Sequence, residues 1–371
     1  MNKTTKTFTY IIGIIMTIAM VGSLILPMLT GNIGQADIEA EAAPTPFPEP
    51  TLPAPPDISA INFDSKYLHS SGLFTVTAPT GWIAGSGSNT PDELRASLTN
   101  SAYMSLVEVR ISKNHAGIAD LDALSAFLDK TWLNHTWSGY SRWHETSRKT
   151  TEDGKVQIDF NLSRGRSHMI ARQESWIEAG DIYTVRVVMA ENAPRELKFI
   201  LQGVADGIER LPMYADAPFG WEAYFDNLDK HILRYPSDWE VTDAAPGLPA
   251  TIIGDDLTLA VATFDVAISS EEDASDWIEE QRSGIKARSV EAVQVAGAPG
   301  YKVSYRYRTL DGEVESGLLI MLNGTDNRLH VANLRMRNLN ENLLSVQQSE
   351  FPWLAVIDTF QLVPELAVDL Q

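Results

Sequence analysis

The sequence of this chain contains an internal duplication, which constrains the fold more than any other feature. A short apolar segment leads into Pro79 and Trp82, and a similar one leads into Pro236 and Trp239. A Pro directly after a strand ends its hydrogen-bond ladder, and the Trp that follows can cover the end of a sheet. Because further landmarks recur in the same order after each pair, the sequence predicts two copies of one fold.

Each copy continues with the same succession of strand and helix patterns. The Val- and Ile-rich segments Ser105–Ile111 and Leu259–Ile268 read as strands, and each is followed by apolar residues at helical spacing. A hairpin comes next, with its turn at Arg164-Gly165 in the first copy and at Asp311-Gly312 in the second. A further strand and a closing helix complete each copy.

This succession is typical of an α+β fold, in which helices pack on the faces of a mostly antiparallel sheet. At 371 residues the chain also has room for two domains of about 150 residues each. We therefore expect two tandem α+β units behind one transmembrane helix. The expected limits are a cytoplasmic N-terminus at 1–9, a transmembrane helix at 10–29, a Pro-rich linker at 30–65, a first repeat at 66–212, a connector at 213–221, a second repeat at 222–364 and a tail at 365–371.

The N-terminus predicts the transmembrane helix. Lys3 and Lys6 precede an uncharged run from Tyr10 to Leu29, which can cross a bilayer as a helix at ~1.5 Å per residue. Positive charge on its N-terminal side keeps that end in the cytoplasm, so the rest of the chain lies outside it. A cleaved signal peptide is the alternative, with an apolar part that usually spans only about 7–15 residues. The prolines that follow, up to Pro56, predict a semi-rigid spacer because each lacks an N–H and fixes φ.

Charge and cysteine usage limit the partners. The formal net charge of -20 disfavours nucleic acid and anionic lipid surfaces, because both are negatively charged. The absence of Cys excludes disulfides, thiolate metal ligands and a lipid-modified N-terminal cysteine. The partners that remain are the cell membrane, through the N-terminal helix, and an unknown envelope protein or glycan.

The order of the elements resembles the PsbP-like family, which contains the extrinsic photosystem protein and many bacterial secreted proteins. The resemblance rests on the openings Phe74–Trp82 and His231–Trp239, the hairpin in each copy, and the closing segments Val204–Ile208 and Val356–Phe360. It implies that each unit is an α/β/α sandwich and that the chain is a non-catalytic partner or assembly factor. It does not imply the metal-linked role of the photosystem proteins, because no ligand residues match.

No pattern in the sequence predicts catalysis, a cofactor or a metal site. The two histidines nearest to each other in sequence are His135 and His144. Their spacing fits neither a zinc-binding helix nor a structural zinc motif. Gly85-Ser86-Gly87 lacks the Gly-x-Ser-x-Gly of a nucleophile elbow. The acidic residues Glu271–Asp273 favour the start of a helix rather than a calcium loop. We therefore expect no catalytic residue, no cofactor and no metal.

One segment of the first repeat, Lys130–Lys149, is rich in Trp, Tyr, Arg and His and lacks a counterpart in the second repeat. Such side chains are common in binding hot spots and in sugar-binding platforms, and binding often resides on loops that the scaffold does not need. The alternative is that these aromatic side chains cover the sheet as part of the core. The candidate binding surface comprises Trp137, Tyr140, Arg142, Trp143 and His144.

Together these features favour a non-catalytic, membrane-anchored protein that binds or stabilises a partner at the cell envelope. A carrier of a small molecule or lipid, with a pocket between sheet and helix, is the second hypothesis. A hydrolase is the third, and it would need a nucleophile and a base that the fold brings together. A large apolar cavity would instead favour the carrier.

Overall fold

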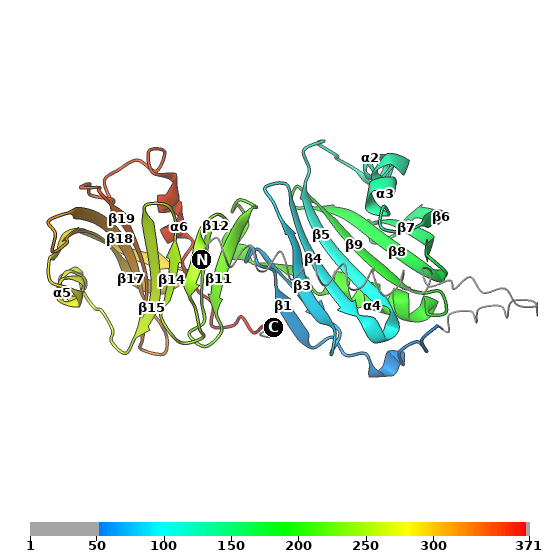
Figure 1. Cartoon of the computed structure of the whole chain (residues 1–371), viewed down its shortest axis with the longest axis horizontal. Helices are drawn as coiled ribbons and strands as arrows, with labels where there is room; N and C mark the ends of the chain where they lie inside the picture. Colours follow the sequence, from blue (N-terminus) through cyan, green and yellow to red (C-terminus); the bar gives the residue numbers. More distant parts are fainter. Residues whose placement is uncertain (1–51, 369–371) are drawn as a thin grey trace, which may run out of the picture. The chain divides into compact units, whose positions relative to one another are not determined.

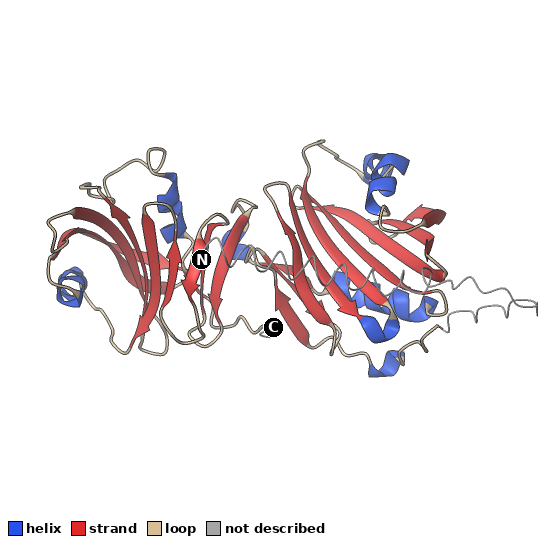
Figure 2. Cartoon of the chain, in the orientation of Figure 1, coloured by secondary structure: helices blue, strands red, loops and turns tan. Residues whose placement is uncertain are grey.

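The computed structural model describes residues 52–368, which form two antiparallel, sheet-rich units with few helices (Figures 1 and 2). The fold class is α+β and mostly β. The expected transmembrane helix at 10–29 and most of the Pro-rich linker lie outside the described residues. Within residues 52–368, no helix has the length and apolar character needed to cross a membrane.

The first repeat is built from ten strands and three α-helices. In chain order these are β1 (Ser65–Leu68), β2 (Phe74–Ala78), β3 (Ile83–Asn89), β4 (Glu93–Asn100), β5 (Ser105–Lys113), α2 (Leu121–Phe127), α3 (Lys130–Thr136), β6 (Arg142–Thr150), β7 (Val156–Arg164), β8 (Ser167–Glu178), β9 (Asp181–Ala190), α4 (Pro194–Asp206) and β10 (Ile208–Arg210).

The second repeat follows the same order with one helix fewer. Its elements are β11 (Trp221–Asp226), β12 (His231–Pro236), β13 (Glu240–Asp243), β14 (Ala250–Ile253), β15 (Leu257–Phe264), α5 (Glu271–Gln281), β16 (Ile285–Val295), β17 (Ala298–Arg308), β18 (Val314–Asn323), β19 (Leu329–Arg337), α6 (Ala355–Asp358) and β20 (Gln361–Leu362).

The two repeats have the same sheet topology. Each contains a seven-stranded sheet, in the order β3-β4-β5-β9-β8-β7-β6 in the first repeat and β13-β14-β15-β19-β18-β17-β16 in the second. Each also contains a three-stranded sheet, β1-β2-β10 or β11-β12-β20. The strands are antiparallel, and the hairpin expected at Asp311-Gly312 joins β17 to β18. This agreement in topology is what the repeated landmarks predict.

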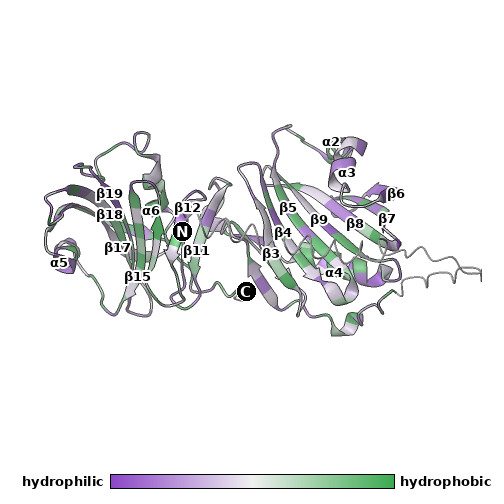
Figure 3. Cartoon of the chain, viewed as in Figure 1, coloured by the Kyte–Doolittle hydropathy of each residue, from purple (hydrophilic) through white to green (hydrophobic). Residues whose placement is uncertain are grey.

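The burial pattern of its strands shows that the large sheet of the first repeat is covered on both faces at its centre. Alternate residues of β4 and β5 are buried, which is visible as alternating bands of hydropathy (Figure 3). Every residue of the central strand β9 is buried. A strand whose two sets of side chains are both buried must lie between two packed layers. The large sheet is therefore the middle layer of the first repeat.

Two separate apolar clusters form these layers in the first repeat. On one face, Leu124 of α2 and Trp137 at the end of α3 pack against β7, β8 and β9. On the other face, Ile200 and Val204 of α4 pack with the small sheet against β4, β5 and β9. The second repeat has the same arrangement, with α5 on one face and α6 with its small sheet on the other.

Capping residues set where the outer helices begin. The Asp120 carboxylate accepts the backbone N–H of Ala123 and caps α2, and the Ser270 hydroxyl accepts that of Asp273 and caps α5. Short oxygen-bearing side chains at this position satisfy N–H groups that have no partner within the helix. Three acidic residues in the first turn of α5 add a favourable interaction with the helix dipole.

The opening motifs are not buried equally. Trp82 is 8% exposed and belongs to the core of the first repeat, whereas Trp239 is only half-buried at the edge of the second core. The Trp239 indole lies against Gly254, where a Cβ atom would approach its Nε1 atom to 2.8 Å. The Pro-x-x-Trp motif therefore marks a shared position in the fold without fixing how deeply the Trp is buried.

The segment Lys130–Lys149 is not a loop, contrary to our expectation. Its first part is α3, capped by Asp129, and its last part belongs to the edge strand β6. Trp137 follows α3 directly and is 1% exposed, with its ring centroid 4.9 Å from that of Phe160. The insertion therefore provides a structural helix and a core Trp.

We expect Trp137→Ala to lower the free energy of unfolding by about 3–5 kcal/mol, because it removes a fully buried aromatic side chain and leaves a cavity. Trp143→Ala serves as the control, since Trp143 is only half-buried and should cost clearly less. Urea denaturation followed by circular dichroism measures both. Equal and small losses for the two variants would contradict the core position of Trp137.

Candidate functional site

The five residues of the sequence-predicted binding surface do not share one environment. Trp137 is buried in the core and cannot contribute to an exposed surface, which corrects that part of the prediction. Arg142 and His144 are exposed, and Tyr140 and Trp143 are half-buried. Burial of Tyr140 raises the pKa of its phenol. The four residues other than Trp137 remain a predicted binding surface.

A groove of about 380 Å³ lies within this predicted surface. Trp143 and His144 of β6 line it together with Lys130, Leu133 and Asn134 of α3. The Trp143 indole N–H donates to the Asn134 side-chain oxygen at 3.2 Å, which holds the ring at the wall of the groove.

A larger cavity, of about 580 Å³, lies in the second repeat. Its walls come from four places: the β11–β12 hairpin, the β16–β17 turn, the β18–β19 loop, and the C-terminal segment with Leu362 and Pro364. Apolar and small residues such as Leu228, Ala298 and Pro299 make up much of the wall. Asp229, Asp326, Arg328 and His330 form one polar end.

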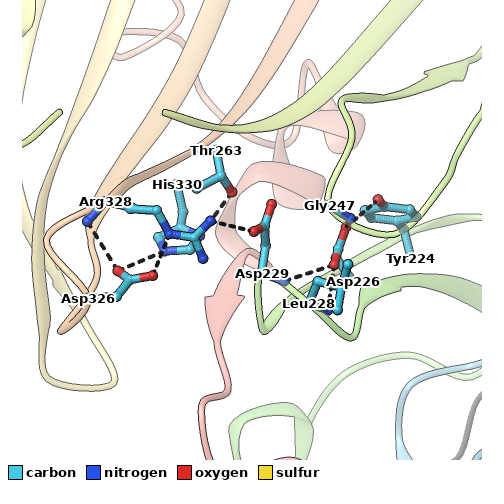
Figure 4. A network of polar contacts seen from close by, with 9 residues as sticks. All are labelled: Tyr224, Asp226, Leu228, Asp229, Gly247, Thr263, Asp326, Arg328 and His330. Carbon is cyan, nitrogen blue, oxygen red and sulfur yellow. Dashed lines mark hydrogen bonds and ion pairs between the residues drawn. The ribbon is translucent and has the colours of Figure 1, made fainter. Parts of the chain in front are cut away.

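Asp226 shapes the hairpin that carries one wall. Its carboxylate accepts backbone N–H groups from Leu228 at 2.8 Å, Asp229 at 2.9 Å and Gly247 at 2.8 Å (Figure 4). Burial alone would raise the pKa of Asp226, but these three donors outweigh it and hold the pKa below its ordinary value. The Tyr224 hydroxyl donates to the same carboxylate at 3.3 Å.

An Arg between two carboxylates forms the polar end. Arg328 donates from Nη1 to Asp229 at 2.7 Å and from Nε to Asp326 at 2.7 Å (Figure 4). The hydrogen bond to Asp326 is the main reason that the pKa of Arg328 is raised. Partial burial favours a higher pKa for Asp326, but its hydrogen bonds with Arg328 leave the pKa lowered. These ion pairs tie the β18–β19 loop to the β11–β12 hairpin.

His330 is the second residue of β19, directly after this loop, and is 2% exposed. Its Nδ1 atom is 3.2 Å from the Thr263 hydroxyl, and its Nε2 atom is 3.6 Å from Asp326 Oδ1. Burial lowers the pKa of His330, which favours the neutral ring. A neutral imidazole has one donor and one acceptor nitrogen, so His330 can exchange one hydrogen bond with a molecule in the cavity.

A second histidine lies directly behind His330. The His231 ring is 2% exposed, and its centroid is 5.7 Å from that of His330. Among the described residues, neither of its ring nitrogens has a hydrogen-bond partner. Burial lowers the pKa of His231 to about 4. An unpaired polar group in a core costs stability, so a side chain of this kind requires an explanation.

The first repeat shows which residues occupy the same positions in the other copy. Strand pairing identifies these positions, because the two repeats have the same strand order. The corresponding residues are His69 for Asp226, Phe74 for His231, Ile111 for Thr263 and Tyr183 for His330. Apolar and aromatic residues of one copy are thus replaced by His, Thr and His in the other.

The β18–β19 connection differs in the same way. In the first repeat Glu178 pairs with Asp181 across a tight turn, whereas in the second Asn323 pairs with Leu329 and leaves a longer loop. That loop carries Asp326 and Arg328. The second repeat has therefore acquired both the polar core residues and the loop that brings charged residues to the cavity.

Hydrogen-bonding chemistry fits this arrangement better than metal binding or nucleophilic catalysis. In the described part of the chain, no group of three or more His, Asp or Glu side chains could hold a metal ion. Thr263, His330 and Asp326 follow one another as a hydroxyl, an imidazole and a carboxylate. Thr263, however, is not one of the residues that line the cavity, and its hydroxyl lies within the sheet as the cross-strand neighbour of His330.

Sequence reasoning missed this site. One signal was present, because the second opening motif carries His231 where the first carries Phe74. A His at a strand position that must be buried indicates a polar environment in the core. The rings that His231 contacts include His330 of β19 and Phe360, which are distant in sequence, so their proximity could not be predicted.

No family model and no curated protein matches the chain. Among solved structures it is similar to the cyanobacterial PsbP protein CyanoP from Synechocystis sp. PCC 6803, with 18% identity and a TM-score of 0.30, over 38% of this chain and 92% of that chain. A Bacteroides thetaiotaomicron VPI-5482 protein has 14% identity and a TM-score of 0.26, over 38% and 48% of the two chains.

The immunity protein TplEi of T6SS from Pseudomonas aeruginosa, solved in complex with a peptide, has 8% identity and a TM-score of 0.23, over 82% of this chain and 100% of that chain. Likenesses at this level of identity and TM-score do not establish a shared function.

We expect His231→Phe to remove part of the acid sensitivity of the fold. The pKa of His231 is about 4 in the folded state and about 6.5 when unfolded, so the unfolded chain binds more protons between these values. Wild-type stability is therefore full above about pH 6.5 and falls by up to ~3 kcal/mol as the pH drops to about 4. Urea denaturation between pH 7 and pH 4 measures the slope.

His144→Phe is the matched control, since His144 is exposed and its replacement should leave the slope unchanged. Burial also lowers the pKa of His69 to about 4. His69 therefore makes a second pH-dependent contribution to the free energy of unfolding, which both variants retain. An unchanged slope in His231→Phe would show that the His231 ring is not held neutral by burial.

Proposed function

We propose that this chain is a membrane-anchored binding protein of two PsbP-like repeats, 66–212 and 222–364, outside the cytoplasm. Its second repeat holds a small, uncharged organic molecule in the cavity beside His330. The observation that carries the proposal is a cavity of about 580 Å³ whose polar end contains His330, at the position that Tyr183 occupies in the first repeat. Ligand pockets commonly have volumes of about 300–1,000 Å³.

The composition of the wall supports a molecule with an apolar body. Leu228 and Leu362 offer aliphatic surface, and Ala298 and Pro299 leave room beside it. Transfer of apolar surface from water to such a wall is favourable by roughly 25 cal/mol per Å². An apolar wall with a few polar groups at one end is the usual composition of a site that orients an amphipathic small molecule.

The charges at the polar end support an uncharged head group. Asp229 and Asp326 contribute two negative charges, and Arg328 and Lys230 contribute two positive ones. Burial lowers the pKa of His330 and so favours its neutral form. A balanced set of donors and acceptors favours a hydroxyl or amide, because either can both give and accept a hydrogen bond without burying an unpaired charge.

The N-terminal sequence supports the location that we propose. The uncharged run 10–29 behind Lys3 and Lys6 fits a membrane anchor, and the prolines that follow fit a spacer. The opening, hairpin and closing motifs support PsbP-like repeats of the α/β/α sandwich type. In this arrangement the groove beside Trp143 and His144 is the site offered to an envelope protein or glycan.

The ligand proposal is tested with Nile red, an uncharged apolar dye whose fluorescence rises when it leaves water. We expect saturable binding to the purified protein and at least tenfold weaker binding to Ala298→Trp, because the added indole fills the cavity. Fluorescence titration measures both affinities. Ala292→Trp is the matched control, since Ala292 is exposed on β16 and does not line the cavity. Equal binding by Ala298→Trp and wild type would contradict the cavity as the site.

The membrane anchor is tested on the full chain in its native membrane. We expect the protein to remain in the membrane fraction after an alkaline carbonate wash, because an inserted helix resists extraction. Deletion of residues 1–29 should move the protein to the soluble fraction. Immunoblotting of the fractions measures the partition. A soluble protein whose N-terminus lies after residue 29 would instead show a cleaved signal peptide.

A further inference from the structure

A second feature of the second repeat follows from the helix that it lacks. In the first repeat, α3 and Trp137 cover the outer face of the large sheet, where Val188, Met169 and Leu162 are part of the same apolar cluster. The second repeat passes directly from α5 to β16. Within residues 52–368, no helix takes the place of α3 on the corresponding part of its sheet.

The residues at the uncovered positions are charged rather than apolar. Strand pairing places Arg335 opposite Thr258, where the first repeat has Val188 opposite Leu106. It also places Arg337 opposite Glu315. The first repeat has Ala190 opposite Met169 at that place, the last pair of the corresponding hairpin.

These residues line a hollow of about 360 Å³ together with Arg282. Arg282 lies at the C-terminal end of α5, and its guanidinium carbon is 4.5 Å from the ring centroid of Tyr307. Tyr307 is 3% exposed, so the ring is a fixed surface on which the Arg is stacked. Three Arg side chains from α5 and β19 thus border one hollow, which we call the Arg hollow.

The guanidinium groups of the Arg hollow keep much of their hydrogen-bonding capacity. Arg335 is 3.9 Å from Glu315, a separation that is too long for a strong ion pair. The guanidinium of Arg337 makes no ion pair or side-chain hydrogen bond with any residue in 52–368, and Arg282 makes only its contact with Tyr307. Since Asp311 and Glu315 are the acidic residues that line the hollow, its charge is positive overall.

A local positive charge is unusual on a chain whose net charge is -20. If these Arg side chains served stability alone, carboxylates of the chain could neutralise them, and no hollow beside them would be needed. Planar guanidinium groups instead match tetrahedral oxyanions, because each can donate two parallel N–H groups to two oxygens. A hollow of this volume has room for a phosphate group and a few additional atoms, at ~30 Å³ for each water-sized unit.

We propose that the Arg hollow binds a phosphate group, held by Arg282, Arg335 and Arg337. Either inorganic phosphate or the phosphate of a small ester supplies the same dianionic oxyanion. This site lies on the opposite face of the sheet from His330, so it is independent of the ligand proposed for the cavity.

Isothermal titration calorimetry of the full-length protein at low ionic strength tests the proposal. The titrants are inorganic phosphate and glycerol 3-phosphate. We expect saturable binding to wild type and at least tenfold weaker binding to the double variant Arg335→Gln with Arg337→Gln. Raised salt should weaken binding, since the contact is between charges. Tighter binding of glycerol 3-phosphate identifies a phosphate ester as the ligand class, and equal binding identifies inorganic phosphate.

Arg308→Gln is the matched control, because Arg308 is exposed on the neighbouring strand β17 and does not line the hollow. It removes the same charge and should leave phosphate affinity within about twofold, a change worth ~0.4 kcal/mol. Circular dichroism verifies that each variant is folded. Absence of saturable binding to folded wild type, or equal binding by wild type and the folded double variant, would overturn the proposal.

Discussion

Burial of both faces of the central strands is the constraint on which the rest of each repeat depends. In the first repeat β9 has no exposed residue, and it is paired with β5 on one side and β8 on the other. Such a strand satisfies its backbone groups through its two neighbours and its side chains through two covering layers. The helices and the small sheet are needed because those two faces would otherwise be in contact with water.

The duplication allows packing residues to be distinguished from residues with another role. Both repeats use the same strand order, so a position that is apolar in one copy has no structural need for a charge in the other. Buried His231 in place of Phe74 costs desolvation without a compensating partner in the described residues. Arg335 in place of Val188 likewise contributes nothing to a core. Both departures occur in the second repeat: Arg335 lines the hollow beside α5, and His231 contacts His330, which lines the larger cavity.

The main feature that the first repeat has and the second lacks contributes to packing. Its additional helix α3 places Trp137 against Phe160 and closes the outer face of the sheet. The sequence suggested the opposite, because a segment rich in Trp, Arg and His resembles a recognition surface. Amino-acid composition reports what a side chain could contact, but it does not report on which side of a helix that side chain lies.

Local patterns predicted most of the strands in the middle of each large sheet. Apolar alternation and the turn residues Asp311-Gly312 identified β17, β18 and their counterparts, because buried strands and tight turns have strong local requirements. The edge strands β3 and β6 were not predicted, and neither was β4, which lies between β3 and β5. An edge strand is largely exposed, so a polar sequence such as that of β6 satisfies it and leaves no periodic signal.

The sequence by itself therefore determined the duplicated α+β architecture, the absence of disulfides and the order of the buried strands, since these follow from local periodicity and composition. Only the tertiary structure decided which side chains meet. His231, His330 and Asp326 are brought together by the pairing of strands and hairpins, as are Arg282 and Arg335. Contacts between segments far apart in the chain depend on register and layer packing, and neither is encoded in any short stretch of sequence.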